Sequence, residues 1–495
     1  MVCDFAFSYQ CLSVFICGFD LRVPTLNKDD KFARIAALRP ARMREAALPD
    51  APEQSDGGDR LEKLLGARVN RNHYGEHLSL RQWYATPEMC SPDARSLSLL
   101  LPQCADATDS MKTAIDPERW LFLDTETTGL AGGTGTYAFM VGIAWWDAGG
   151  LQVEQLFLRD LDEEHSLLLE LSERMKERPV LVTFNGKSFD WPLLDTRYRM
   201  TRADPAFTPQ LHLDLLHPAR QLWRMRLGSV RLKDLERHIL SGDGGSLDWS
   251  RHDDIDSSLI PQMYFDYLRG GPAEPLAGIF RHNQMDLRGL AALAGKILAL
   301  LDSGNGIAGA AQAEPREAME VLGLSRIMRN RGHSARAREL YETALRFGLP
   351  RTVERLAQQE LAQLAKRERD YARAIKLWDA LRENPTAGAR KEAPLLAEDA
   401  RKALESAIVA AEQLAIHYEH RAQEPGRALE LIRAAIVKLE SAHTNGRLIP
   451  ERSAKIKARL ARRLARLERA SPGTPISRLA PRKSPIGRLA LPGEI

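Results

Sequence analysis

The sequence predicts an α/β domain with a mixed central sheet, followed by an all-α helical domain. Two observations support this fold class: strand patterns alternate with helical patterns over residues 116–302, whereas residues 315–470 show helical spacing alone. A chain of 495 residues also exceeds one ordinary hydrophobic core, so more than one domain is expected. Residues 303–314, which are small and featureless, are the predicted linker between the two domains.

The rest of the chain carries weaker signals. Residues 1–58 are predicted to be poorly ordered, residues 59–115 form a short lead-in segment that opens with a helix, and residues 471–495 form a disordered tail rich in Pro and Arg. The apolar start lacks the basic region and cleavage site of a signal peptide, and no stretch reaches the roughly 18 uninterrupted apolar residues of a membrane helix. We therefore expect a cytoplasmic protein without a membrane partner.

The composition also favours a reducing compartment and indicates no particular partner. The five cysteines include no C-x-x-C pair, which argues against a zinc site or a disulfide scaffold and fits a reducing compartment. The net charge is only +4, so the overall charge indicates no particular partner. Any nucleic-acid signal must come from how the charges are distributed.

The α/β domain contains five strand candidates and four helix candidates. The strands are expected at 120–124, 138–146, 151–158, 180–184 and 211–216. The helices are expected at 163–177, 190–199, 231–240 and 274–301. The first three strands follow one another closely, which favours antiparallel pairing, and the later strands are separated by helices, which favours parallel crossovers. The sheet should therefore be mixed.

The helical half contains a pattern that occurs three times, each time after another amphipathic helix. The three copies are Ala337, Leu340, Tyr341, Ala344; Ala374, Leu377, Trp378, Leu381; and Ala428, Leu431, Ile432, Ala435. Their spacings are about 37 and 54 residues, the first close to the 34-residue tetratricopeptide period. This favours a tetratricopeptide-like stack of helical hairpins, which could bind a protein partner; the alternative is an irregular bundle.

Two carboxylates end the first strand in the stretch WLFLDTETTGL. Asp124 and Glu126 are two residues apart, so a strand places both on one face. Like charges this close repel unless a cation lies between them, and hard oxygen ligands suit Mg²⁺ or Mn²⁺. The alternative for the pair alone is a solvated strand end.

Further acids follow in two later stretches. In LVTFNGKSFDWP, Asp190 opens a helix, where the helix dipole keeps a carboxylate ionised. In FRHNQMDLRGL, His282 and Asp286 are four residues apart on one helix face. Together with Asp124 and Glu126, these groups could converge beside the central strand.

FLDTETTGL, FNGKSFD and HNQMD resemble, in order and spacing, the three motifs of the DEDD, ribonuclease H-like 3′–5′ exonucleases. The stretch DLLHPARQLWRMRLGSVRLKDLE and the helical half are more narrowly similar to the YprB ribonuclease H-like family. The resemblance implies that Asp124, Glu126, Asp190 and Asp286 hold two divalent cations, Mg²⁺ or Mn²⁺, which clamp the scissile phosphate of DNA or RNA.

His282 departs from the family pattern. In the DEDD group that has a catalytic His, this residue precedes the last Asp by five positions, where Arg281 stands here. His282 lies four positions before Asp286, where the other group carries Tyr. A helix places that position on the Asp286 face, so His282 is the expected general base. The alternatives are a residue that supports the metal ligands or one on the helix surface.

Four more positions around the motifs invite functional interpretations. Thr127 and Asn185 are expected to contact the nucleic acid, although Asn185 could simply hold its turn. Phe189 could wedge against a terminal base, or pack under the sheet. Asp214 either supports the metal ligands or merely ends its strand.

Helix 451–470 has a basic face of the kind that attracts phosphates. Its apolar side carries leucines, and the rest carries Lys455, Lys457 and the candidate nucleic-acid ligands Arg459, Arg462, Arg463 and Arg466. The alternative is a solvated helix that caps the stack.

Taken together, the residues and the resemblance predict a metal-dependent nuclease, expected to be a 3′–5′ exonuclease. A structure-specific endonuclease is one rival, because the same two-metal centre serves both activities. The other rival is a non-catalytic adaptor whose helical repeats carry the function. The four intact acids favour the enzyme.

Overall fold

The computed structural model describes residues 56–86, 89–100, 116–129, 134–202, 209, 211–241, 249, 251, 254–302, 315–383, 394–444 and 450–469. The predicted linker 303–314 and tail 471–495 lie outside these residues, as does the N-terminal segment up to residue 55.

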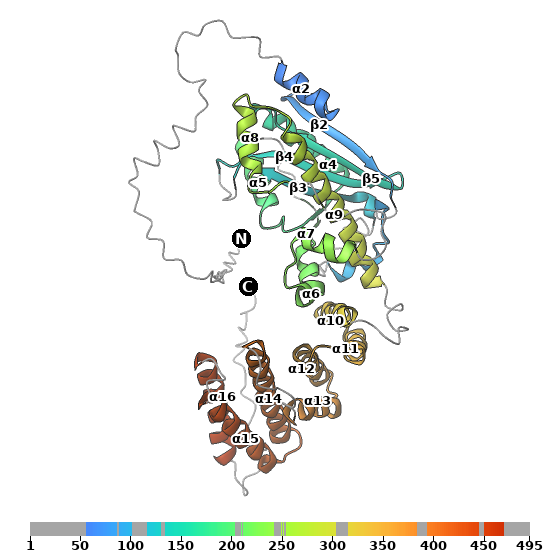
Figure 1. Cartoon of the computed structure of the whole chain (residues 1–495). Helices are drawn as coiled ribbons and strands as arrows, with labels where there is room; N and C mark the ends of the chain where they lie inside the picture. The colour runs from blue at the N-terminus through green and yellow to red at the C-terminus, as the bar shows by residue number, and fades with distance from the viewer. Residues whose placement is uncertain are drawn as a thin grey trace, which may run out of the picture. The chain divides into compact units, whose positions relative to one another are not determined.

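A mixed seven-stranded sheet forms the first part, with the strand order β1-β2-β5-β4-β3-β6-β7. Figure 1 labels β2, β3, β4 and β5. The strands are β1 (Arg68–Asn72), β2 (Gly75–Tyr84), β3 (Trp120–Thr127), β4 (Ala138–Asp147), β5 (Gly150–Phe157), β6 (Val180–Thr183) and β7 (Leu211–Asp214). β3, β4 and β5 pair antiparallel, whereas β6 runs parallel to both β3 and β7. The predicted mixed sheet is confirmed.

The hairpin of β1 and β2 extends this sheet beyond the predicted strands. β2 pairs antiparallel with β5, and β1 pairs only with β2. Both strands lie in the 59–115 segment, to which the sequence analysis assigns no strand. β1 has the sequence RVNRN, and such a polar edge strand lacks the apolar alternation that identifies a strand.

Helices cover both faces of the sheet, and the two cores divide by strand alternation. Trp120 and Phe122 belong to one core, with α6 (Leu216–Leu227) and the second half of α9 (Leu276–Asp302). Leu121 and Leu123 point to the opposite core. Burial on both faces explains why the strands read as continuous apolar runs.

The opposite core is built by α4, α5, α8 and the first half of α9, with α2 beside β2. Their bounds are α2 (Asp56–Leu65), α4 (Glu164–Glu177), α5 (Asp190–Thr201) and α8 (Ile260–Leu268). α7 (Leu232–Leu235) continues into a short π-helix, Glu236–Leu240, below α9. α9 lies across β3, β4 and β5 (Figure 1). This helix is therefore placed to bring its own side chains to the end of β3.

The second part is all-helical, as predicted, and each of its helices packs on the next. The helices are α10 (Pro315–Asn330), α11 (Ser334–Phe347), α12 (Arg351–Arg367), α13 (Tyr371–Glu383), α14 (Pro394–His420), α15 (Pro425–Thr444) and α16 (Pro450–Arg469). The three copies of the repeated pattern lie on α11, α13 and α15, with their side chains buried or half-buried. α10 packs on α6 of the first part. No helix among the described residues is long and apolar enough to span a membrane.

A buried histidine in β2 gives the fold a defined pH dependence. His77 is fully buried, and its Nδ1 lies 2.9 Å from the Ser166 hydroxyl of α4. Burial lowers the pKa of His77 to about 4, with Glu154 opposing this shift and Arg159 reinforcing it. The unfolded chain therefore binds a proton at His77 more readily than the folded chain does. As a result, the free energy of unfolding is at its full value above about pH 6.5 and decreases as the pH falls towards 4.

We expect His77→Gln to flatten the dependence of the free energy of unfolding on pH between about 6.5 and 4. Glutamine can still contact Ser166 but cannot take up the proton. Urea unfolding at several pH values measures the change, which should be on the order of 2 kcal/mol across the window. A variant with the wild-type slope would contradict this assignment.

Candidate metal-binding active site

β3 places the first two acids on one face of the sheet. Asp124 and Glu126 follow Trp120 and Phe122 in the alternation, so all four lie on the same side. In the register with β4, Asp124 lies opposite Gly142 and Glu126 opposite Met140. Their carboxylates therefore project towards the side on which the second half of α9 packs.

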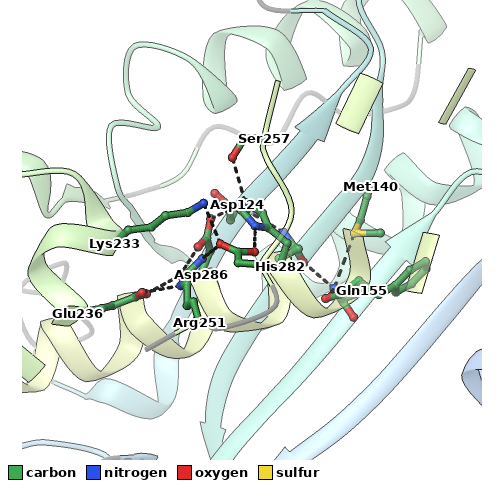
Figure 2. A network of polar contacts seen from close by, with 12 residues as sticks. Asp124, Met140, Gln155, Lys233, Glu236, Arg251, Ser257, His282 and Asp286 are labelled. Carbon is green, nitrogen blue, oxygen red and sulfur yellow. Dashed lines mark hydrogen bonds and ion pairs between the residues drawn. The ribbon is translucent and has the colours of Figure 1, made fainter. Parts of the chain in front are cut away.

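Asp124 is held by a side chain of α9. Asn283 Nδ2 donates to Asp124 Oδ2 at 2.9 Å, and Gln155 Nε2 donates to Asn283 Oδ1 at 2.9 Å. Gln155 Nε2 also donates to the Phe280 carbonyl, which fixes the orientation of the Gln155 amide and therefore of Asn283. Figure 2 shows Gln155 on β5 and Asp124 on β3, the two ends of this hydrogen-bonded series. Space for Asn283 exists because Gly142 has no side chain: a Cβ there would lie 2.0 Å from Asn283 Oδ1.

We expect Gly142→Ala to push Asn283 away from Asp124. Because Gln155 holds Asn283, the overpacking should cost about 1–3 kcal/mol of stability, and losing a partner of a site carboxylate should lower the predicted nuclease activity by about 10- to 100-fold. Thermal unfolding and the hydrolysis assay below measure both. Gly135→Ala, where no atom lies within 4 Å of the new Cβ, is the control. Equal behaviour of the two variants would refute the role of Gly142.

Asp190 begins α5 and receives a hydrogen bond from Thr125 Oγ1 at 2.6 Å. The turn that leads to it is held by Asp214 at the end of β7. The Asp214 carboxylate accepts from the backbone N–H groups of Asn185 at 2.8 Å and Lys187 at 3.2 Å. Asp214 therefore shapes the loop that delivers Asp190, which is a supporting role.

α9 contributes His282 and Asp286, and the ring of His282 is buried. Asp254 Oδ1 lies 2.5 Å from His282 Nδ1, and Lys233 Nζ in turn lies 2.8 Å from Asp254 Oδ2. The other ring nitrogen, Nε2, lies 3.7 Å from Asp286 Oδ2 and 3.4 Å from the Ser257 hydroxyl. A carboxylate that orients an imidazole, whose second nitrogen faces the site, is the arrangement of a general base.

Arg251 is the one cation that contacts any of the four acids among the residues described. Its guanidinium pairs with Asp286 and forms two 2.6 Å hydrogen bonds to Glu236 (Figure 2). Glu236 is fully buried, and Arg251 is almost so. Arg251 thus supplies positive charge at the acids and neutralises a carboxylate behind them.

The acids strongly affect one another. Burial, followed by the charges of Asp286, Asp190 and Glu126, raises the pKa of Asp124 well above its usual range. Burial and the charges of Asp286 and Asp190 raise the pKa of Glu126 to about 8. Burial also raises the pKa of Asp190, contrary to the expectation that the helix dipole keeps this carboxylate ionised. The acids therefore share one poorly solvated space that disfavours their ionised forms unless a cation is present.

Divalent cations fit this donor set, which consists of carboxylate oxygens. Among the described residues, however, no three His, Cys, Asp or Glu side chains stand in position to enclose a metal ion. The reason is that these acids are already bonded to protein groups. Asp124 accepts a hydrogen bond from Asn283, Asp190 accepts one from Thr125, and Asp286 forms an ion pair with Arg251. Binding a metal requires these carboxylates to exchange a protein partner for the ion.

The predicted nucleic-acid ligands near the motifs have different environments. Phe189 is 62% exposed, which excludes the alternative of packing under the sheet. Asn185 has a positive φ of 69° and ends up in the turn held by Asp214. The Thr127 hydroxyl donates to the Gly129 carbonyl at 3.0 Å. Phe189 thus has an exposed side chain that a base can stack on, the Thr127 hydroxyl is already bonded, and only the backbone N–H of Asn185 is held by Asp214.

The basic face of α16 is largely paired with α14. Arg459 donates to Glu412 at 2.8 Å, and Arg463 and Arg466 bond to Glu419 at 2.7 Å and 2.8 Å. Glu412 and Glu419 are buried, so these ion pairs hold the two helices together. This arrangement favours the alternative of a capping helix. Arg462 is exposed and pairs with none of the described residues.

Sequence reasoning missed the residues that support the site. Arg251 and Asp254 lie in an irregular stretch. Lys233 and Glu236 lie on α7 and the π-helix that follows it, in the stretch that resembles the YprB family, but the resemblance gave them no role. Asn283 stands inside the third motif, HNQMD, where its contact with Asp124 required knowledge of the register. The polar run after residue 249 was the only available signal, and it does not distinguish a site from a loop.

Comparisons with known proteins give partial matches to this chain. Residues 121–298 match the family model of the RNase_H superfamily. The chain is 27% identical over 311 residues to a Bacillus subtilis (strain 168) protein named "Uncharacterized protein YprB". That match covers 63% of this chain and 67% of the relative.

A solved structure is also similar in part. It is the family B DNA polymerase from the hyperthermophilic archaeon Pyrobaculum calidifontis, with 14% identity and a TM-score of 0.31. The match covers 66% of this chain and 51% of the polymerase, so the chain spans about half of that protein.

Proposed function

We propose that the protein is a metal-dependent 3′–5′ exonuclease, a proposal supported by the match of residues 121–298 to the family model of the RNase_H superfamily. Its substrate is a strand of DNA or RNA, and its cofactors are two divalent cations, Mg²⁺ or Mn²⁺. Asp124, Glu126, Asp190 and Asp286 hold the cations. When bound, the ions supply charge stabilisation to the phosphate and activate the attacking water.

The observation that carries this proposal is the crowding of acidic side chains at the end of β3. Burial and mutual repulsion raise the pKa of Asp124 and Glu126, and Asp286 adds to both shifts. A fold gains nothing in stability from crowding such groups. The cluster is therefore interpreted as a cation site, because a divalent ion removes the repulsion.

The chain's own residues have separate roles in this proposal. His282, held by Asp254 at Nδ1, accepts a proton from the attacking water at Nε2. Asn283 and Thr125 orient Asp124 and Asp190. Exposed Phe189, next to Asp190, stacks on the terminal base and excludes water from the bond that is cleaved.

End-labelled single-stranded DNA and RNA, incubated with the protein and Mn²⁺, test the proposal. A 3′–5′ exonuclease releases a 3′-terminal label at once as a mononucleotide and shortens a 5′-labelled strand in a ladder. Internal fragments at first appearance would indicate an endonuclease. If both polymers stay intact in single-stranded, duplex and branched form, the adaptor hypothesis replaces the enzyme.

A further inference from the structure

A second candidate binding site lies beside the carboxylates. A pocket of about 480 Å³ opens between the end of β6 and the α6–α7 connection. Arg220, Arg224 and Arg231 line it, together with Asn185, Phe184 and Leu216. None of the described residues that line this pocket is acidic.

No acidic group among the described residues neutralises the charge of the three arginines. All three are exposed, and none forms an ion pair with any of the residues that the structure describes. Arg220 and Arg224 are four residues apart on α6, so they lie on one face and repel each other. This contrasts with α16, where Arg459, Arg463 and Arg466 already pair with acids.

Two segments connect the pocket to the carboxylates. Asn185 lines the pocket and belongs to the turn, held by Asp214, that precedes Asp190. On the other side, Leu232 lines the pocket, and the next residue, Lys233, bonds to Asp254. A strand whose end lies at the acids can therefore continue into the pocket.

We propose that this pocket binds a nucleotide of the substrate strand, upstream of the bond that is cleaved. The arginines bind its phosphate, and the apolar side chains of Phe184 and Leu216 contact its sugar and base. The inference rests on the proposed nuclease function and adds where the strand is held. It also explains the charge pattern: negative where the cations bind, positive where the phosphate binds.

The test measures binding and small-substrate hydrolysis separately. Fluorescent 12-nucleotide DNA and RNA strands are titrated in Ca²⁺ at several KCl concentrations, with wild type, three single Arg→Gln variants (Arg220, Arg224, Arg231) and the triple variant. Each lost contact should weaken binding roughly tenfold and reduce the slope of log K against log salt by about 0.7. Arg237→Gln, an exposed arginine outside the pocket, is the control and should bind like wild type.

Hydrolysis of thymidine 5′-p-nitrophenyl phosphate, which reaches only the carboxylates, should be unchanged in every variant. Wild-type binding and salt slopes in the pocket variants would overturn the inference while leaving the nuclease intact. Inorganic phosphate is titrated against the same variants; loss of its binding but not of binding to the strands would also overturn the inference, because the pocket would then hold a free anion. If wild type cleaves neither reporter nor strand, the proposed function itself fails. If the triple variant is less stable than wild type, the strand binding of the three single variants decides whether the inference holds.

Discussion

Asp124→Asn should reduce nuclease activity more than about 100-fold and leave the fold intact. The substitution removes a proposed cation ligand but keeps the shape of the side chain, and the new amide oxygen can still accept from Asn283 Nδ2. Since burial and three neighbouring acids raise the pKa of Asp124, losing its charge relieves repulsion. In EDTA, the melting temperature of this variant should therefore equal or exceed that of wild type.

The matched control is Asp147→Asn at the exposed end of β4. It changes the same charge outside the site and should retain activity. Activity with Mn²⁺ and melting curves in EDTA and in Mn²⁺ are compared for all three proteins. An Asp124→Asn protein with wild-type turnover would show that Asp124 is no ligand, and a large loss of stability in EDTA would show that its charge is structural.

Arg251→Met should destabilise the fold by about 3–5 kcal/mol. Arg251 is 6% exposed and is paired with Glu236, which is fully buried. Removing the guanidinium leaves a buried carboxylate without its counter-ion, next to Asp286 and Asp254. Burial already raises the pKa of Glu236 to about 7 despite the two bonds from Arg251.

A double-mutant cycle isolates this pair. Glu236→Gln should recover part of the stability lost in Arg251→Met, because the buried charge then disappears with its partner. Urea unfolding of wild type, both single variants and the double variant gives the coupling energy. Strictly additive effects would show that the Arg251–Glu236 pair contributes nothing, and Arg251 would then remain only a partner of Asp286.

The strands were predictable where burial on both faces left an apolar run. The candidates 120–124 and 138–146 correspond to β3 (Trp120–Thr127) and β4 (Ala138–Asp147). The sequence pattern ended the first strand at Asp124, because carboxylates interrupt the apolar run. In the structure β3 continues, since Thr125 and Glu126 still pair with β4. The polar side chains from Asp124 onward therefore mark the candidate site and do not mark the end of the strand.

Of the candidate site, the sequence predicted the four acids but not the residues that support them. Asp124, Glu126, Asp190 and Asp286 carry motif spacing, and the structure places Asp190 and Asp286 close enough to raise the pKa values of Asp124 and Glu126. Arg251 could not be predicted in the same way. A lone arginine in an irregular stretch has no periodicity, and its contacts depend on how the chain returns beneath α9.

Counting bound Mn²⁺ is the most direct test of the central claim, that the four acids hold two divalent cations. Electron paramagnetic resonance of free Mn²⁺ gives this number, with thymidine 5′-monophosphate present to supply phosphate oxygens. We expect two Mn²⁺ per chain in wild type and fewer in Asp124→Asn and Asp190→Asn. Wild-type binding no greater than that of a variant in which all four acids are amides would contradict the account.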